Sequence, residues 1–171
     1  MRKTLIVLMG LLFSLNSLAT TVKLSTSKGD IYIELHDKDV PNTVNNFLSY
    51  VKEGFYDGTV FHRVISTFMI QGGGFDKDLN RKEVKSPIKN EASAERKNLR
   101  GTLSMARLPD PHSATAQFFI NVQDNPSLNF TGEQNTRTWG YTVFGHVIQG
   151  MDVVDEIRFE PTGGKPPFRK D

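Results

Sequence analysis

The sequence contains no cysteine. This absence excludes a thiol nucleophile, a cysteine-ligated zinc or iron–sulfur site, and a dithiol redox motif. It also excludes disulfides, which a chain of 171 residues does not need, because a single domain of this size buries enough surface to fold without a covalent cross-link. The 12 phenylalanines supply the apolar surface expected of one globular unit, not of a disordered chain.

Signatures of several enzyme classes are also missing. There is no Gly-x-Ser-x-Gly elbow, no His-Glu-x-x-His pair and no P-loop. The four histidines, at positions 36, 62, 112 and 146, lie far apart without suitably spaced carboxylates, so we expect structural or surface roles and no metal site. The triple glycine at 72–74 has no helix pattern after it, which favours a tight backbone passage over a phosphate cradle.

The first nineteen residues have the pattern of a cleavable secretory signal. Arg2 and Lys3 precede an apolar run at 5–13, and Ser17-Leu18-Ala19 places small residues before a cut after Ala19. The alternative, a membrane anchor, needs about 20 apolar residues, and polar residues interrupt this run from Ser14 onward. We therefore predict a signal at 1–19, a soluble domain at 20–171 and no stable membrane association after cleavage.

Removal of this signal leaves no excess charge of either sign. The signal holds two of the 21 basic residues and none of the 19 acidic ones, so 19 of each remain. A neutral chain has no general electrostatic reason to bind nucleic acid or anionic lipid. Basic clusters around Arg81 and Arg96 are interleaved with glutamates, which is typical of a solvated surface.

Hydrophobic periodicity predicts many short strands and two helices. Apolar residues alternate over 22–35 around a four-residue turn at 27–30, which predicts a β-hairpin. Pro41 and Gly54 bracket helical spacing, which predicts a helix over 41–53. Met151, Val154 and Ile157 mark a second short helix after Gly150. Further strands are expected at 60–64, 68–71, 102–106, 118–122 and 141–147.

This order of elements favours a closed antiparallel β-barrel capped by two helices. Strands that do not alternate with helices argue against a parallel βαβ sheet. The segment from Gly74 to Arg100 is polar and lacks a sustained period. Long ordered loops of this kind often carry function.

Two segments combine a cation, amides and large apolar side chains. The first reads Phe61-His62-Arg63-Val64-Ile65, followed by Phe68-Met69-Ile70-Gln71-Gly72-Gly73. The second reads Gly101-Thr102-Leu103-Ser104-Met105-Ala106-Arg107, followed by Ser113-Ala114-Thr115-Ala116-Gln117-Phe118-Phe119-Ile120-Asn121. Taken singly, the apolar strand residues could be core and Arg63 could be a surface ion-pair partner. Their joint occurrence favours a site.

These runs resemble the cyclophilin family of peptidyl-prolyl cis/trans isomerases. The resemblance extends from about Val22 to Ile157 and includes Val40-Pro41-Asn42-Thr43, Gly54-Phe55-Tyr56 and Val143-Phe144-Gly145. With the secretory signal, the chain resembles the periplasmic cyclophilins of Gram-negative bacteria. The resemblance implies an eight-stranded barrel with two capping helices, no cofactor, and proline-containing polypeptides as partners.

The resemblance also implies a role for each residue of the site. Arg63 falls on the catalytic arginine. Phe68, Met69, Phe119 and Leu128 fall on the pocket for the proline ring. Gln71 and Gln117 match amides that hold the substrate backbone, and Ala106 and Arg107 match the strand edge along which the peptide lies. Tyr141 stands where many eukaryotic members carry histidine, and a phenol there can still pack and donate.

The chemistry of proline isomerisation agrees with these assignments. Amide resonance sets a rotation barrier of about 18–20 kcal/mol, so an X-Pro bond turns in tens to hundreds of seconds. Rotation breaks the conjugation and returns a lone pair to the proline nitrogen. A guanidinium such as that of Arg63 can donate to this nitrogen in the twisted state but not in the planar one. Such differential binding needs neither a nucleophile nor proton transfer.

Two departures from the family pattern lead to predictions, one on cyclosporin binding and one on the closing strand of the barrel. Ser127 stands where many eukaryotic members carry tryptophan, which predicts weak or no cyclosporin binding. After Ile157 comes a tail containing Gly163, Gly164, Pro166 and Pro167, a composition that cannot form a regular central strand. We therefore expect the final closing strand to be missing and an exposed edge to remain at the strand that begins near Val22.

Three functions remain open at this point. The first is an isomerase that accelerates X-Pro rotation during folding of exported proteins. The second is a periplasmic chaperone that binds peptides in the same groove without essential turnover. The third is a periplasmic binding module for another ligand. Arg63 favours the enzyme, because binding a proline ring alone has no use for a donor aimed at its nitrogen.

Overall fold

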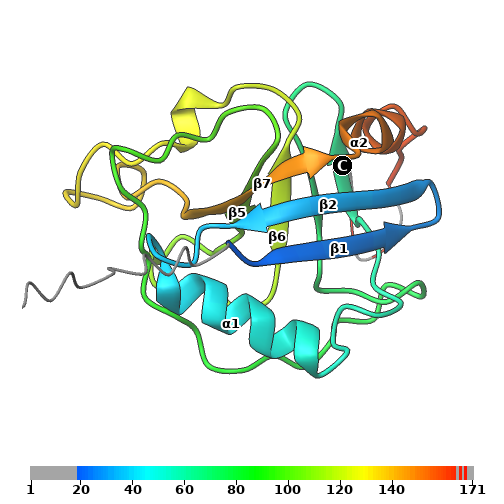
Figure 1. Ribbon diagram of the computed structural model, residues 1–171, viewed down its shortest axis with the longest axis horizontal. Coiled ribbons are helices and arrows are strands. Elements are labelled where there is room, and N and C mark those ends of the chain that lie inside the picture. The colour runs from blue at the N-terminus through cyan, green and yellow to red at the C-terminus, as the bar shows by residue number, and fades with distance from the viewer. Residues whose placement is uncertain (1–18, 165, 167, 169–171) are drawn as a thin grey trace, which may run out of the picture.

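The computed structural model describes residues 19–164, 166 and 168, so most of the expected signal lies outside the described residues. Figure 1 shows a curled β-sheet with a helix along one side and a second helix at the opposite side. Seven strands occur among the described residues: β1 Thr21–Thr26, β2 Gly29–Leu35, β3 Arg63–Ile65, β4 Met69–Gly72, β5 Thr102–Met105, β6 Phe118–Asn121 and β7 Val143–Gln149. The helices are α1 Pro41–Lys52, α2 Met151–Arg158 and the short 3₁₀ helix η1 Pro126–Leu128.

The strands form one antiparallel sheet in the order β1-β2-β7-β5-β6-β4-β3. The prediction of a mostly β architecture with two α-helices is confirmed. The eight-stranded barrel implied by the resemblance is present as seven strands in the described part of the chain. Strands β1 and β3 stand at the two ends of the order and do not pair with each other, so the sheet formed by the described residues curls without closing.

Several of the predicted boundaries are wrong by one or a few residues, and for three of them the backbone pairing gives the reason. The hairpin turn contains only Ser27 and Lys28, because Thr26 and Gly29 already pair. The strand expected at 60–64 begins at Arg63, since the Val60 amide donates instead to the carbonyl of Phe75 at 3.0 Å. Tyr141 precedes β7 because its amide donates to the carbonyl of Leu128 at 3.0 Å.

The core lies inside the curl of the sheet, and α1 covers one side of it. Helix α1 contributes Val44, Phe47 and Tyr50, which are all buried. The Phe47 ring lies 5.2 Å from Phe144 and meets Phe118 edge-on at 5.7 Å. Helical spacing therefore places one apolar face of α1 against the sheet, as the sequence predicted. No helix among the described residues is long and apolar enough to cross a membrane.

The long segment from Gly74 to Arg100 holds the start of α1 in place. Helix α1 has neither an acidic residue in its first turn nor a side-chain N-cap. Glu91 takes that role from a distance: its carboxylate accepts the Thr43 amide at 2.7 Å, the Thr43 hydroxyl at 2.6 Å and the Asn42 side chain at 2.9 Å. A carboxylate stabilises a helix N-terminus by satisfying its free amides and opposing the helix dipole.

Candidate functional site

A small cavity gathers nearly all of the residues singled out in the sequence. It has a volume of about 100 Å³ and lies between the sheet and the 128–141 segment. The residues of the predicted site that line it are Arg63, Phe68, Met69, Gln71, Ala106, Arg107, Phe119, Leu128 and Tyr141. We call this cavity the socket. Gln117 does not line it but contacts it through a hydrogen bond to Gln71.

The guanidinium of Arg63 is held by an amide chain. Antiparallel pairing of β3 with β4 sets Arg63 opposite Gln71, and an Arg63 N–H donates to the Gln71 side-chain oxygen at 3.4 Å. The Gln71 amide nitrogen donates in turn to the Gln117 oxygen at 2.9 Å. In the described part of the chain no carboxylate pairs with Arg63. Its charge and its remaining donors therefore stay available at the socket.

Glycine is required beneath this amide chain. A Cβ on Gly74 would lie 2.5 Å from the Gln117 amide nitrogen, and Gly73 has a φ of +77° with the Phe118 ring 3.0 Å from its Cβ position. No side chain fits at either position without displacing its neighbour. The triple glycine is thus a tight backbone passage, as predicted, and it lets Gln117 reach Gln71.

Apolar side chains form the floor of the socket. Met69 and Phe119 come from the neighbouring strands β4 and β6 and are only 1% and 4% exposed, so they serve the core and the socket together. Phe119 meets the Tyr141 ring edge-on at 5.7 Å. Phe68 lies below the guanidinium of Arg63, with 6.0 Å between the ring centroid and Cζ. This surface suits a compact apolar ring beside a cation.

Arg107 builds the wall of the socket that carries Tyr141. Its guanidinium lies 4.5 Å from the Tyr141 ring centroid and donates to the carbonyls of Gly140 at 3.0 Å and Thr136 at 2.7 Å. Strand β5 ends at Met105, so Arg107 lies just past the strand edge implied by the resemblance. Its donors are largely taken by backbone carbonyls, which indicates that it positions the wall.

Comparison with known proteins identifies the family. The sequence matches the family described as "Cyclophilin type peptidyl-prolyl cis-trans isomerase/CLD" over residues 21–171. The chain belongs to this cyclophilin family. It is 58% identical over 142 residues to peptidyl-prolyl cis-trans isomerase B of Escherichia coli, covering 83% of this chain and 86% of the relative. It is 54% identical over 163 residues to a peptidyl-prolyl cis-trans isomerase of Acinetobacter baylyi, and the match covers 95% of this chain and 85% of the relative.

Solved cyclophilin structures share the fold. A cyclophilin-type isomerase of Cryptosporidium parvum, crystallised in the presence of the dipeptide Ala-Pro, has a TM-score of 0.70 and 28% identity, over 88% of this chain and 91% of that one. A cyclophilin of Hirschia baltica has a TM-score of 0.67 and 25% identity, and the match covers 88% of this chain and 70% of that one. The family assignment and the peptidyl-prolyl isomerase activity implied by the resemblance are therefore confirmed.

A buried asparagine network behind the cyclophilin socket was missed in the sequence. Asn125 donates to the carbonyl of Phe68 at 2.8 Å and to the side-chain oxygen of Asn121 at 2.7 Å. Asn98 donates to the carbonyl of Leu128 at 3.0 Å. The network thus fixes the backbone of two residues that line the socket. Isolated asparagines have no periodic signal, and only Asn121 lay within a run that drew attention.

The histidines include one pair that the sequence did not suggest. His36 and His146, which are 110 positions apart, face each other with 3.1 Å between ring nitrogens. Burial and the neighbouring His146 lower the pKa of His36. Burial also lowers the pKa of His62, with Arg63 adding to the effect. Within the described residues no group of three or more metal-ligating side chains occurs, and none of the four histidines lines the socket.

Proposed function

We propose that this cyclophilin accelerates X-Pro rotation in exported proteins in the periplasm, with Arg63 as the catalytic residue. The observation that carries the proposal is the geometry of Arg63. Its guanidinium has no acidic partner in the described part of the chain, lines an apolar socket and is oriented by Gln71. A donor that can reach the proline nitrogen only when the bond is twisted stabilises the transition state over the ground state.

The remaining residues of the socket would hold the substrate during rotation. A volume of about 100 Å³ is far below the roughly 300–1,000 Å³ of pockets that hold drug-sized ligands, which suits a single small ring. Phe119, Met69 and Leu128 would grip that ring, while Gln71 and Gln117 fix the backbone on the other side of the bond. The Ala-Pro dipeptide used with the Cryptosporidium relative supports proline-containing peptides as substrates here.

Isomerisation of a proline tetrapeptide by the purified protein tests this proposal against the chaperone alternative. An isomerase raises the rate of cis–trans exchange and speeds refolding of a protein whose slow step is proline rotation. A chaperone without essential turnover suppresses aggregation equally well with and without the Arg63 side chain. The chaperone alternative would be established by two results together: the original protein does not catalyse cis–trans exchange, and the Arg63→Ala variant still suppresses aggregation.

Export is tested by the mass of the protein recovered from the periplasm. We propose that the leader is cut after Ala19, because a basic start, an apolar run and small residues precede this position. Intact-mass spectrometry of the periplasmic fraction should then show a chain that begins at Thr20. A periplasmic protein that retains Met1 would show that the segment is an anchor.

Cyclosporin inhibition should be weak, because Ser127 offers little contact beside the socket. Ser127 is exposed on η1, next to Leu128. We expect Ser127→Trp to tighten cyclosporin binding by at least about tenfold, since an added aromatic anchor with an N–H donor often dominates an interface. The inhibition constants of the two proteins in the tetrapeptide assay measure this effect. Equal constants would contradict it.

A further inference from the structure

Three asparagines form a continuous hydrogen-bonded path between two sides of the socket. Asn125 donates to the Phe68 carbonyl at 2.8 Å and to the Asn121 side-chain oxygen at 2.7 Å. Asn121 donates to the Asn98 side-chain oxygen at 3.2 Å, and Asn98 donates to the Leu128 carbonyl at 3.0 Å. Phe68 and Leu128 both line the socket. We call this path the asparagine bridge.

The asparagine bridge is buried, and its polar groups are paired. Asn98, Asn121 and Asn125 are 1%, 0% and 4% exposed. The Asn98 oxygen also accepts the Ser104 hydroxyl at 2.8 Å, and the Asn121 amide also donates to the Thr102 hydroxyl at 2.9 Å. A satisfied buried network favours one arrangement, because any other leaves a polar group unpaired in a medium of low dielectric constant.

The Leu128 carbonyl is the junction between the bridge and the wall that carries Tyr141. It accepts the Asn98 side chain at 3.0 Å and the Tyr141 amide at 3.0 Å, and these two bonds use both of its lone pairs. The Asn98 backbone amide also donates to the side-chain oxygen of Asn129 at 2.7 Å. The position of Asn98 therefore sets the positions of both Leu128 and Tyr141 at the socket.

The two segments that the bridge joins have little else to hold them. Phe68 lies in the turn between β3 and β4, and Leu128 ends η1. Both residues are only partly buried, and η1 has no side-chain cap and no buried side chain. Segments with few buried apolar contacts open at a low free energy. A hydrogen bond from the buried interior is therefore what keeps each of them in place.

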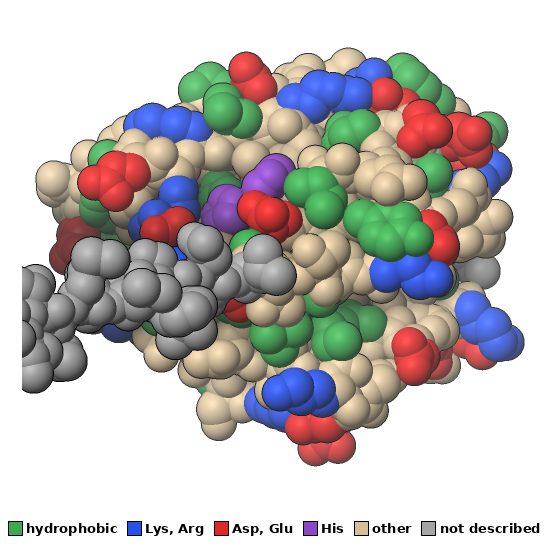
Figure 2. All heavy atoms as spheres, viewed as in Figure 1, with side chains coloured by type: hydrophobic (Ala, Val, Ile, Leu, Met, Phe, Trp, Pro, Cys, Tyr) green, Lys and Arg blue, Asp and Glu red, His purple; other side chains and the backbone are tan. Residues whose placement is uncertain are grey.

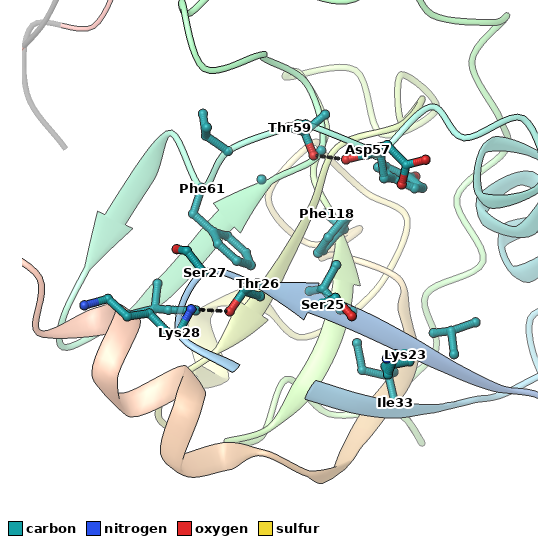
Figure 3. Close-up of a pocket in the computed structure, with 18 of the residues that line it drawn as sticks. Lys23, Ser25, Thr26, Ser27, Lys28, Ile33, Asp57, Thr59, Phe61 and Phe118 are labelled. Atoms are coloured by element: carbon teal, nitrogen blue, oxygen red, sulfur yellow. Dashed lines mark hydrogen bonds between the residues drawn. The ribbon is translucent and has the colours of Figure 1, made fainter. Parts of the chain in front are cut away.

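A larger hollow of the molecule lies apart from the bridge. Its volume is about 690 Å³, and Figure 2 shows apolar side chains gathered in a hollow between β1 and the side that carries α1. In Figure 3, Ile33, Phe61 and Phe118 lie around this space. Among the described residues it shares no lining residue with the socket, and none of the three asparagines lines it. A change in the bridge is therefore expected to act on the socket.

We propose that Asn98 is a positioning residue that fixes the width of the socket through the asparagine bridge, and so makes the socket select the five-membered proline ring over a larger ring. The inference rests on the proposed function only in that the socket receives a proline ring. Asn98 does not line the socket. Its loss lowers the fraction of molecules in which the socket is formed, which raises the apparent dissociation constant in proportion.

The kinetic test uses the full chain and the substrate succinyl-Ala-Ala-Pro-Phe-p-nitroanilide. Asn98→Ala should raise KM by about five- to tenfold, because the socket is formed in only a fraction of the molecules. It should change kcat by less than about twofold, since Arg63 and Gln71 keep their strand pairing. A loss confined to kcat, with KM unchanged, would overturn the proposal.

Ring selectivity is a readout that a merely stabilising role of the bridge does not move. The matched substrate carries pipecolic acid, whose ring has one methylene more than that of proline. One methylene in a close-fitting apolar pocket changes kcat/KM by about 10- to 200-fold, so the original protein should prefer the proline peptide. In Asn98→Ala the ratio of kcat/KM for the two peptides should fall by at least about threefold. An unchanged ratio would contradict the proposed control of width.

Val44→Ala is the control for loss of stability. Val44 is buried on α1, and no residue of α1 lines the socket. Both Val44→Ala and Asn98→Ala should lower the free energy of unfolding, which denaturant unfolding measures. In Val44→Ala, however, KM and ring selectivity should stay within about twofold of the original values under conditions in which all variants are folded. Equal shifts in the two variants would show that the bridge only stabilises the fold.

Asn125→Ala breaks the bridge at its other end, and it keeps the test decisive if Asn98→Ala does not fold. It removes the bond to the Phe68 carbonyl and should also raise KM and lower ring selectivity. The double variant should raise KM by less than the product of the two single effects, because either substitution breaks the same path. Effects that multiply would show that the two asparagines act separately, which excludes a bridge.

Peptide affinity in the Arg63→Ala background separates failure of this inference from failure of the proposed function. Nuclear magnetic resonance titration with acetyl-Ala-Ala-Pro-Phe-amide measures binding without turnover. Adding Asn98→Ala to Arg63→Ala should weaken this binding by about five- to tenfold. If the original protein catalyses no exchange but this difference persists, the proposed function fails and the inference stands. Equal affinity with and without Asn98→Ala would overturn the inference.

Discussion

Arg63→Ala is expected to lower isomerase turnover by about 10²- to 10³-fold, which is the usual loss for one preorganised transition-state donor. The guanidinium lines the socket and is oriented by Gln71 at 3.4 Å. No carboxylate among the described residues neutralises it. Alanine leaves the apolar floor intact, so substrate should still bind while the twisted bond loses its donor. The loss should therefore appear in kcat more than in KM.

Two further variants define what the guanidinium contributes. Arg63→Lys keeps the charge but replaces a planar fork with a flexible point charge, so turnover should fall between those of the alanine variant and the original protein. Arg81→Ala removes an exposed arginine outside the socket and should leave turnover unchanged. Tetrapeptide kinetics with matched circular dichroism measure all three. Near-native activity of a folded Arg63→Ala protein would exclude the proposed mechanism.

Glu91→Ala is expected to lower the free energy of unfolding by about 2–3 kcal/mol, because charged hydrogen bonds to a buried helix start are lost together. The carboxylate binds the Thr43 amide at 2.7 Å and its hydroxyl at 2.6 Å, and Thr43 is fully buried. Removing Glu91 leaves these donors without a partner at the end of a helix that has no cap of its own. Denaturant unfolding measures the change.

Glu95→Ala is the matched control for this effect. Glu95 lies in the same segment but is exposed, so its removal should change stability by less than about 0.5 kcal/mol. Glu91→Gln keeps the shape and some acceptor capacity of the side chain but loses its charge. The free energy of unfolding of this variant should therefore lie between those of Glu91→Ala and Glu95→Ala. If Glu91→Ala and Glu95→Ala have equal midpoints, the contacts at the start of α1 do not stabilise the fold.

Local patterns were enough to predict most elements. Alternation predicted the hairpin of β1 and β2, and Pro41 with Gly54 predicted α1 within a residue or two, because strand and helix periods are properties of neighbouring residues. Boundaries failed where a distant backbone group competed with the local pattern. The Val60 amide bonds the Phe75 carbonyl and the Tyr141 amide bonds the Leu128 carbonyl, and neither partner is visible in a local window.

The order of motifs was enough to indicate the site, because an arginine, two glutamines and several large apolar residues occur in an arrangement that resembles one family. The tertiary structure decided how they meet. Pairing of β3 with β4 sets Arg63 against Gln71, and pairing of β4 with β6 brings in Phe119. The supporting asparagines carry no periodic signal, since a buried hydrogen bond depends on where the chain folds and not on spacing.

By itself, the sequence indicated the fold class through its local periods, and its resemblance to known cyclophilins indicated the family and the candidate residues of the socket. Only the tertiary structure decided that Glu91 caps a helix 48 positions away and that His36 meets His146. These are contacts between distant segments. Their energies depend on how strands are ordered in the sheet, and no local pattern of residues records that order.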